Sequence, residues 1–143
     1  MKNIITKIRL KDNYILKQVS KNGNLEILKI FVSEGLTLTD IRSDNNYALR
    51  LASENGHLET VKFLFSQGLT ITDIRSNNNY ALHMASRRGH LEIVKFLFSK
   101  GLTIIDIRSD NNYALHQASS NGHLQIIFFF YFTRFDKNRY TFK

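Results

Sequence analysis

Hydrophobic and polar positions recur along this chain with a period of 33 residues. Residues 36–68 and 69–101 are identical at 25 of 33 positions, and the same pattern continues on both sides of them. Four tyrosines and four glycines mark the period: Tyr14, Tyr47, Tyr80 and Tyr113, and Gly23, Gly56, Gly89 and Gly122. A fixed period of this length is typical of solenoids and other repeat architectures. We therefore predict four units, at residues 3–35, 36–68, 69–101 and 102–134, the last degenerate, and a basic tail at 135–143.

Each unit contains two segments with the hydrophobic spacing of an α-helix. In the third unit the first segment covers residues 80–88, where alanine and leucine favour a helix with one apolar face. We expect the asparagines at 77–79 to cap its start and Gly89 to end it in the left-handed conformation. The second segment, 90–100, has an apolar surface so wide that it implies neighbours on more than one side. The next residues, 101–109, alternate weakly and predict an extended turn.

Residues 80–101 resemble the ankyrin repeat. They read YALHMASRRGHLEIVKFLFSKG, and the family pattern is T-P-L-H-x-A-x-x-x-G-H-L-E-x-V-x-x-L-L-x-x-G. The match recurs in register over nearly the whole chain. The resemblance implies an all-α solenoid of ankyrin repeats, with a helix-turn-helix and a hairpin-like loop in each unit. It also implies a non-catalytic scaffold that binds a partner protein in the concave groove of the array.

The style of the units is similar to that of the ankyrin proteins of giant DNA viruses, whose units often read NNYALR-ASENGHLE-VKFL. That similarity implies a location inside the cell, in the host cytoplasm if the protein is viral. The chain has no cysteine, which agrees with a reducing compartment. We also expect a monomer.

The units depart from the ankyrin pattern at the start of the first helix. Thr-Pro becomes Tyr-Ala, as at Tyr80 and Ala81, which removes a proline that presets the first helical residue. Asparagine replaces the loop glycine at Asn45, Asn78 and Asn111, and asparagine is the next most tolerant residue for a positive φ. We therefore expect the loop to survive, somewhat loosened.

Positive charge is concentrated at the two ends of the chain. Of the net charge of +8, residues 1–33 carry +5, residues 34–133 carry none and residues 134–143 carry +3. A groove that follows nucleic-acid phosphates needs basic residues along its body. We therefore expect a protein partner rather than nucleic acid or a membrane. The alternative is a nucleic-acid or anionic-membrane binder that uses the basic termini and the Phe-rich C-terminal segment.

No combination of residues in the sequence points to catalysis, a cofactor or a metal. There is no phosphate-binding loop, zinc-protease motif or serine-hydrolase motif. His57, His90 and His123 recur once per unit, which places them a repeat apart, whereas the ligands of one metal converge within about 2 Å of it. We expect these histidines to be structural residues at the start of the second helix, and we expect no enzyme.

The positions that say most about partner binding are those that differ between otherwise copied units, because a partner would contact the side chains there. They lie at the groove-facing slot of the first helix, at its end and at the loop tip. The candidates for partner binding are Arg50, Glu54, Asn77, His83, Arg87, Arg88, His116 and Ser120. Arg87 and Arg88 are the strongest, since the pair lies mid-array and can clamp an acidic partner. Neutral drift of solvated residues is the alternative.

The last unit loses the pattern of the others. Its second helix reads HLQIIFFFYFTRF, with Phe128 at the position of a lysine and no closing glycine, whereas an array normally ends in a polar cap. The apolar run from Ile126 to Phe132 is shorter than the ~20 residues that a membrane span needs. Three explanations of this ending remain open. The last helix is adhesive, a frame slip in a T-rich coding tract produced it, or the protein is decayed and has no partner.

Overall fold

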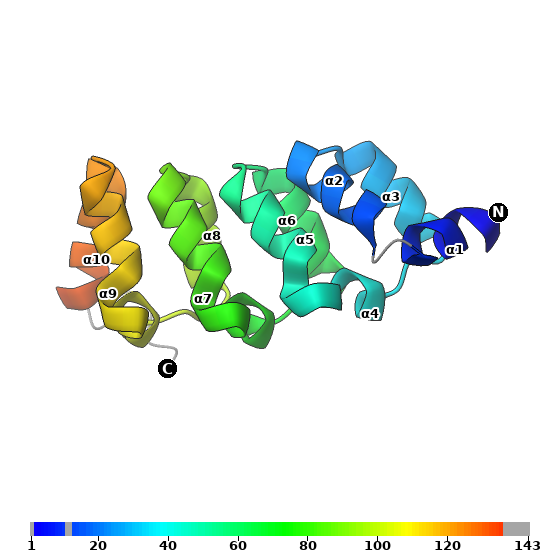
Figure 1. Cartoon of the computed structure of the whole chain (residues 1–143). Helices are drawn as coiled ribbons and strands as arrows, with labels where there is room; N and C mark the ends of the chain where they lie inside the picture. The colour runs from blue at the N-terminus through cyan, green and yellow to red at the C-terminus, as the bar shows by residue number, and fades with distance from the viewer. Residues whose placement is uncertain (1, 11–12, 136–143) are drawn as a thin grey trace.

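The computed structural model describes residues 2–10 and 13–135, and within these ranges it consists of helices and loops without a β-strand (Figure 1). The helices, in chain order, are α1 Lys2–Leu10, α2 Tyr14–Asn22, α3 Leu25–Ser33, α4 Leu38–Ile41, α5 Ser43–Glu54, α6 Leu58–Ser66, α7 Ile71–Arg88, α8 Leu91–Ser99, α9 Ile104–Ser120 and α10 Leu124–Phe135. Most of the predicted tail, residues 136–143, lies outside the described residues. Paired helices form a single row from one end of the chain to the other, which confirms the predicted all-α solenoid (Figure 1).

Two layers of helices run along this row. The first layer holds α2, α5 and the C-terminal parts of α7 and α9, and the second holds α3, α6, α8 and α10 (Figure 1). Both layers contribute to one continuous core. Leu49 and Leu82 of the first layer and Leu64 and Leu97 of the second are fully buried. The wide apolar surface predicted for the second helices therefore meets neighbours on more than one side.

The segment between successive helix pairs is helical, and the extended, hairpin-like loop predicted for it is wrong. Residues 38–41 form α4, and the equivalent residues begin α7 and α9. A capping box explains the helix: the carboxylate of Asp40 accepts from the Thr37 N–H at 2.9 Å, and the Thr37 hydroxyl accepts from the Asp40 N–H at 3.3 Å. This reciprocal bonding stabilises a helix start. Ile41 then anchors the short helix in the core.

Three consecutive residues with left-handed backbone join this short helix to the first helix of the pair. In the third unit they are Asn77, Asn78 and Asn79, with φ of 52°, 56° and 58°. The positive φ predicted for the middle asparagine is confirmed, and both neighbours share it. The capping role predicted for the cluster is wrong. The Asn79 amide instead donates to Ser109 of the next unit at 3.2 Å, and its oxygen has no partner among the described residues.

Gly89 ends the first helix of the third unit in the left-handed conformation, as predicted, with φ of 84°. The missing side chain also makes room for the next unit. A Cβ on Gly89 would lie 2.6 Å from the ring of His123, whose Nε2 donates to the backbone carbonyl of Arg87 at 2.8 Å. The same contact recurs earlier in the array: His57 with Gly23, and His90 with Gly56. These histidines are structural ties at the start of the second helices, as expected.

The last helix, α10, keeps some of the buried positions of a second helix, but its outer face differs from that of the others. Phe130 is buried. Phe128 and Phe132 are 57% and 56% exposed, at the positions that Lys95 and Ser99 hold one unit earlier. α10 therefore presents aromatic side chains to solvent where α8 presents polar ones.

Candidate protein-binding face

The first helices place a row of tyrosines and basic side chains along one face of the array. Tyr47, Tyr80 and Tyr113 each pack against the residue 30 positions earlier, in the preceding unit. The Nζ of Lys17 lies 4.8 Å from the ring centre of Tyr47, and the guanidinium of Arg50 lies 5.1 Å from the ring centre of Tyr80. A cation over an aromatic face is attracted by the ring quadrupole. The row is therefore held in place across the unit boundaries.

Arg50 and His83 hold the same position in adjacent units, and both help to build this row. Arg50 also lies 4.7 Å from the ring centre of Tyr47 and donates to two backbone carbonyls of the asparagine turn. His83 is only 4% exposed, and its ring centre is 4.8 Å from that of Tyr113. Burial lowers the pKa of His83, which keeps the ring neutral at physiological pH. The direct partner contact predicted for His83 is therefore replaced by a structural role between two units.

The structure separates the two arginines that the sequence presents as a pair. The guanidinium of Arg88 lies 3.1 Å from the carboxylate of Glu54 in the preceding unit. Arg87 is exposed and forms no ion pair within residues 2–10 and 13–135. Of the two, Arg87 presents a guanidinium that is free to bind a partner's carboxylate.

The other predicted contact residues are exposed and form a strip rather than a cluster. Asn77 stands at the turn before the first helix, and Arg87 stands at the far end of the same helix. His116 and Ser120 continue the strip into the fourth unit, at the positions of His83 and Arg87. Of the predicted set, His83 is the one residue that the structure buries.

A hollow part of this face, between the first two units, was not predicted from the sequence. A pocket of about 310 Å³ there is lined by Tyr14, Lys17, Gln18, Lys21, Asp44, Tyr47 and Leu51. Lys17 is paired with Asp44 at 2.9 Å, and Lys21 is exposed. A signal for this pocket was available, because Lys17 and Lys21 stand at the same variable positions as Arg50 and Glu54.

A second row of contacts, along the edge of the short helices, ties each unit to the next. Three ion pairs make it: Arg9 with Asp40 at 2.8 Å, Arg42 with Asp73 at 2.9 Å, and Arg75 with Asp106 at 2.8 Å. Hydrogen bonds from Arg9 lower the pKa of Asp40 to about 2. Burial opposes the ionisation of Asp73 and Asp106, but hydrogen bonds from arginine, threonine and asparagine outweigh it, so the pKa of both is lowered. These carboxylates stay ionised at neutral pH and hold the units together.

Comparison with known families agrees with this geometry. A family model described as "Ankyrin repeats (many copies)" matches residues 49–98 and 82–130, which together span more than half of the 143-residue chain. The chain belongs to the ankyrin repeat family. A search of curated proteins finds no match to it.

Ankyrin repeats generally mediate protein–protein interaction and are typically non-catalytic. In the described part of this ankyrin array, no three His, Cys, Asp or Glu side chains are grouped so that they could hold a metal ion. Of the helices described, none combines the length and the apolar character that crossing a membrane requires. The surface of this ankyrin array carries the tyrosine–cation row and the exposed Arg87.

Proposed function

We propose that this ankyrin array is a non-catalytic interaction module that binds a partner protein on the face of its first helices. The observation that carries the proposal is the row of tyrosine rings and cations along that face. Aromatic and arginine side chains are the residue types that dominate binding energy at protein interfaces. The cross-unit stacking of Arg50 on Tyr80 holds part of this surface in place before a partner arrives.

The charges of the face favour a partner segment that carries carboxylates. Lys21, Arg50 and Arg87 form no ion pair within the described part of the chain, whereas Asp44 and Glu54 are each already paired. Charge complementarity of this kind selects an acidic partner. Because a guanidinium binds a carboxylate through two parallel hydrogen bonds, Arg87 is the expected anchor.

The same proposal includes the organisation and location of the protein. We propose four units at 3–35, 36–68, 69–101 and 102–134, a monomeric state, and a location inside the cell, in the host cytoplasm if the protein is viral like the ankyrin proteins that it resembles. The 33-residue period supports the division, and the lack of cysteine supports a reducing compartment. Sedimentation velocity of the purified chain tests the monomer, and a dimer contradicts it.

A second candidate function is binding to nucleic acid or to an anionic membrane through the basic termini and α10. The exposed rings of Phe128, Phe132 and Phe135, with Arg134 in the same helix, favour it. Aromatic side chains beside basic ones are typical of surfaces that contact membranes or stacked bases.

Chemical-shift mapping by NMR distinguishes the two candidates. A partner captured with the tagged full-length chain from its native cell is purified and titrated into the isotope-labelled chain. We expect the largest shifts in α5 and in residues 80–88, because these helices carry the tyrosine–cation row, and small shifts in α6 and α8. Titration with anionic vesicles or DNA should leave α10 unchanged. Partner-induced shifts confined to α6, α8 or α10 would contradict the proposed function.

A further inference from the structure

The arginine–aspartate contacts at the short helices run in one direction, from donors in one unit to an acceptor in the next. Arg42 donates to both carboxylate oxygens of Asp73, at 2.9 and 3.0 Å, and Asn46 donates to the same carboxylate at 3.1 Å. At the next boundary Arg75 and Asn79 bind Asp106 in the same way. An arginine and an asparagine thus form a two-armed receptor for the capping-box aspartate of the unit that follows.

In the last unit this receptor is open. Arg108 and Asn112 hold the positions of Arg75 and Asn79, and both are exposed, whereas Asn79 is 7% exposed. Neither Arg108 nor Asn112 has a hydrogen bond or an ion pair among the described residues. The arginine–aspartate ion pairs between units join residues 31 positions apart. The sequence has Arg139, not an aspartate, 31 positions after Arg108.

The histidine contact is open at the same end of the array. A Cβ on Gly89 would meet the ring of His123 at 2.6 Å, whereas a Cβ on Gly122 would meet nothing within 4 Å among the described residues. The backbone carbonyl of Arg87 accepts from His123, and Ser120 holds the equivalent position in the last unit. Gly122 therefore leaves space for the ring of one more histidine, and the backbone carbonyl of Ser120 can accept a hydrogen bond from it.

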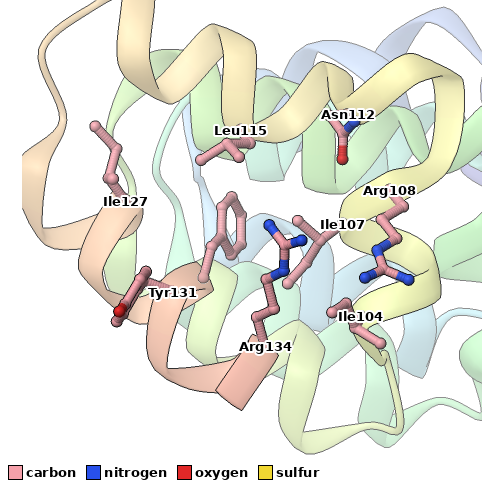
Figure 2. Close-up of a pocket in the computed structure, with 9 residues that line it drawn as sticks. Ile104, Ile107, Arg108, Asn112, Leu115, Ile127, Tyr131 and Arg134 are labelled. Carbon is pink, nitrogen blue, oxygen red and sulfur yellow. The ribbon is translucent and has the colours of Figure 1, made fainter.

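The open receptor is part of a pocket of about 160 Å³ between α9 and α10 (Figure 2). Figure 2 shows Arg108 extending from α9 and Arg134 extending from α10 at this pocket. Apolar side chains, among them Ile107, Leu115 and Tyr131, form most of its wall, and no carboxylate lines it. The pocket is therefore apolar with a positive rim.

The apolar wall consists of positions that the next unit covers elsewhere in the array. Tyr131 holds the position of Phe65 and Phe98. Phe65 and Phe98 are 8% and 1% exposed, whereas Tyr131 is 56% exposed. The ring of Phe65 is covered by Phe96 of the next unit, with the ring centres 5.4 Å apart. The end of the array thus has the shape and the chemistry of a unit boundary without its second half.

We propose that this pocket is the docking site for an ankyrin unit of another protein, which binds at the end of the array as a fifth unit would. The aspartate of its Thr-x-x-Asp capping box accepts hydrogen bonds from Arg108 and Asn112. Its apolar side chains cover Leu115 and Tyr131, whose equivalents Leu82 and Phe98 are buried within the array. This surface lies at the end of the stack and is separate from the face of the first helices, so the proposal does not depend on the function proposed above.

A second copy of the chain does not fit this site, because its own first unit lacks the acceptors. Lys7 and Asn24 hold the positions of Asp40 and His57. Stacking of one copy on another would bring Lys7 against Arg108, and a contact between like charges is unfavourable. The partner is therefore a different chain, whose first ankyrin unit keeps the aspartate and the histidine.

The test uses the full chain and a folded probe. The probe is three tandem copies of residues 69–101, since arrays of near-identical repeats fold readily. Its first copy presents Asp73 and His90 without a preceding unit, and Arg75→Glu in its last copy prevents the probe from stacking on itself. Circular dichroism verifies that the probe is helical.

Titration calorimetry should show one-to-one binding of the probe. Arg108→Ala in the chain, or Asp73→Asn in the first copy of the probe, should each weaken binding at least about tenfold, because each removes the charged hydrogen-bond pair. Lys95→Ala, a control that also removes a basic side chain but on the exposed side of α8, should bind like the wild type. Arg108→Ala should also unfold at the wild-type temperature, so that lost binding is not lost folding.

Absence of binding by the folded probe, or equal binding by the wild-type and Arg108→Ala chains, overturns the proposal. Binding that requires removal of residues 136–143 overturns it as well, and assigns the pocket to the chain's own tail. A dimer of the chain that Arg108→Ala abolishes would assign the pocket to a second copy instead.

Discussion

Individual side chains in this array serve two units at once, and Asp73 is the clearest case. Within its own unit its carboxylate accepts from the Thr70 N–H at 2.8 Å, which closes the capping box. It also accepts from Arg42 and Asn46 of the preceding unit. Loss of this one charge therefore weakens a helix start and a unit boundary together.

Asp73→Asn should lower the free energy of unfolding by on the order of 2–3 kcal/mol. Each hydrogen bond to a charged group contributes about 1.5–3 kcal/mol, and part of this loss is offset because the exposed side of Arg42 regains water. Urea unfolding measures the loss. The control is Glu59→Gln, whose ion pair with Lys62 lies on the surface and should contribute about 0–1 kcal/mol. Equal losses in the two variants would contradict the double role of Asp73.

Residue roles that depend on a single unit could be predicted from the sequence, and roles that depend on two units could not. The left-handed backbone of Gly89 and Asn78 follows from local chain chemistry. The burial of His83 and the pairing of Asp73 depend on how the next unit docks, which joins residues about 30 positions apart. The Thr-x-x-Asp sequence in successive units was a visible sign of Asp73, but weak alternation nearby favoured an extended turn instead.

At the scale of elements, the short helix at the start of each unit is the feature that sets the unit boundary. Its first turn carries the capping-box aspartate, and the arginine follows directly after its last residue, as in α4 with Asp40 and the C-cap residue Arg42. Adjacent short helices therefore present opposite charges to each other. In Figure 1 they follow one another along one edge of the array, with the paired helices rising from them.

The stability that these aspartates contribute should be lost in acid. The pKa of Asp40 is about 2 in the folded chain against an ordinary value of 3.8, and the pKa of Asp73 is also lowered. Because the unfolded chain binds these protons more strongly, the contribution is complete above about pH 5 and is lost as the pH falls through the folded pKa values.

Urea unfolding of the wild type and Asp73→Asn across this range isolates one member of the row. The difference in unfolding free energy should be constant above about pH 5 and shrink steadily below about pH 4, as the wild-type carboxyl takes up a proton. A difference that stayed constant down to about pH 2 would contradict the lowered pKa of Asp73.

The whole molecule has a direction and two distinct candidate surfaces. At the short helices, arginine donors point from each unit to the aspartate of the next. The first unit has Lys7 in place of that aspartate, and the last unit keeps the donors Arg108 and Asn112. The face of the first helices could be predicted from the sequence, because variable positions in a repeated pattern mark a binding face. The pocket at the end of the array could not, because recognising an uncovered residue such as Tyr131 requires knowing what covers Phe98.

Binding of the captured partner to charge-reversed chains decides whether the face of the first helices is the interface. Arg87→Glu should weaken binding at least about tenfold, since it places a carboxylate opposite an acidic partner. Lys95→Glu makes the same change of charge in the same unit, on the exposed side of α8, and should bind as tightly as the wild type. Wild-type affinity of the Arg87→Glu chain, measured by calorimetry, would contradict the proposed interface.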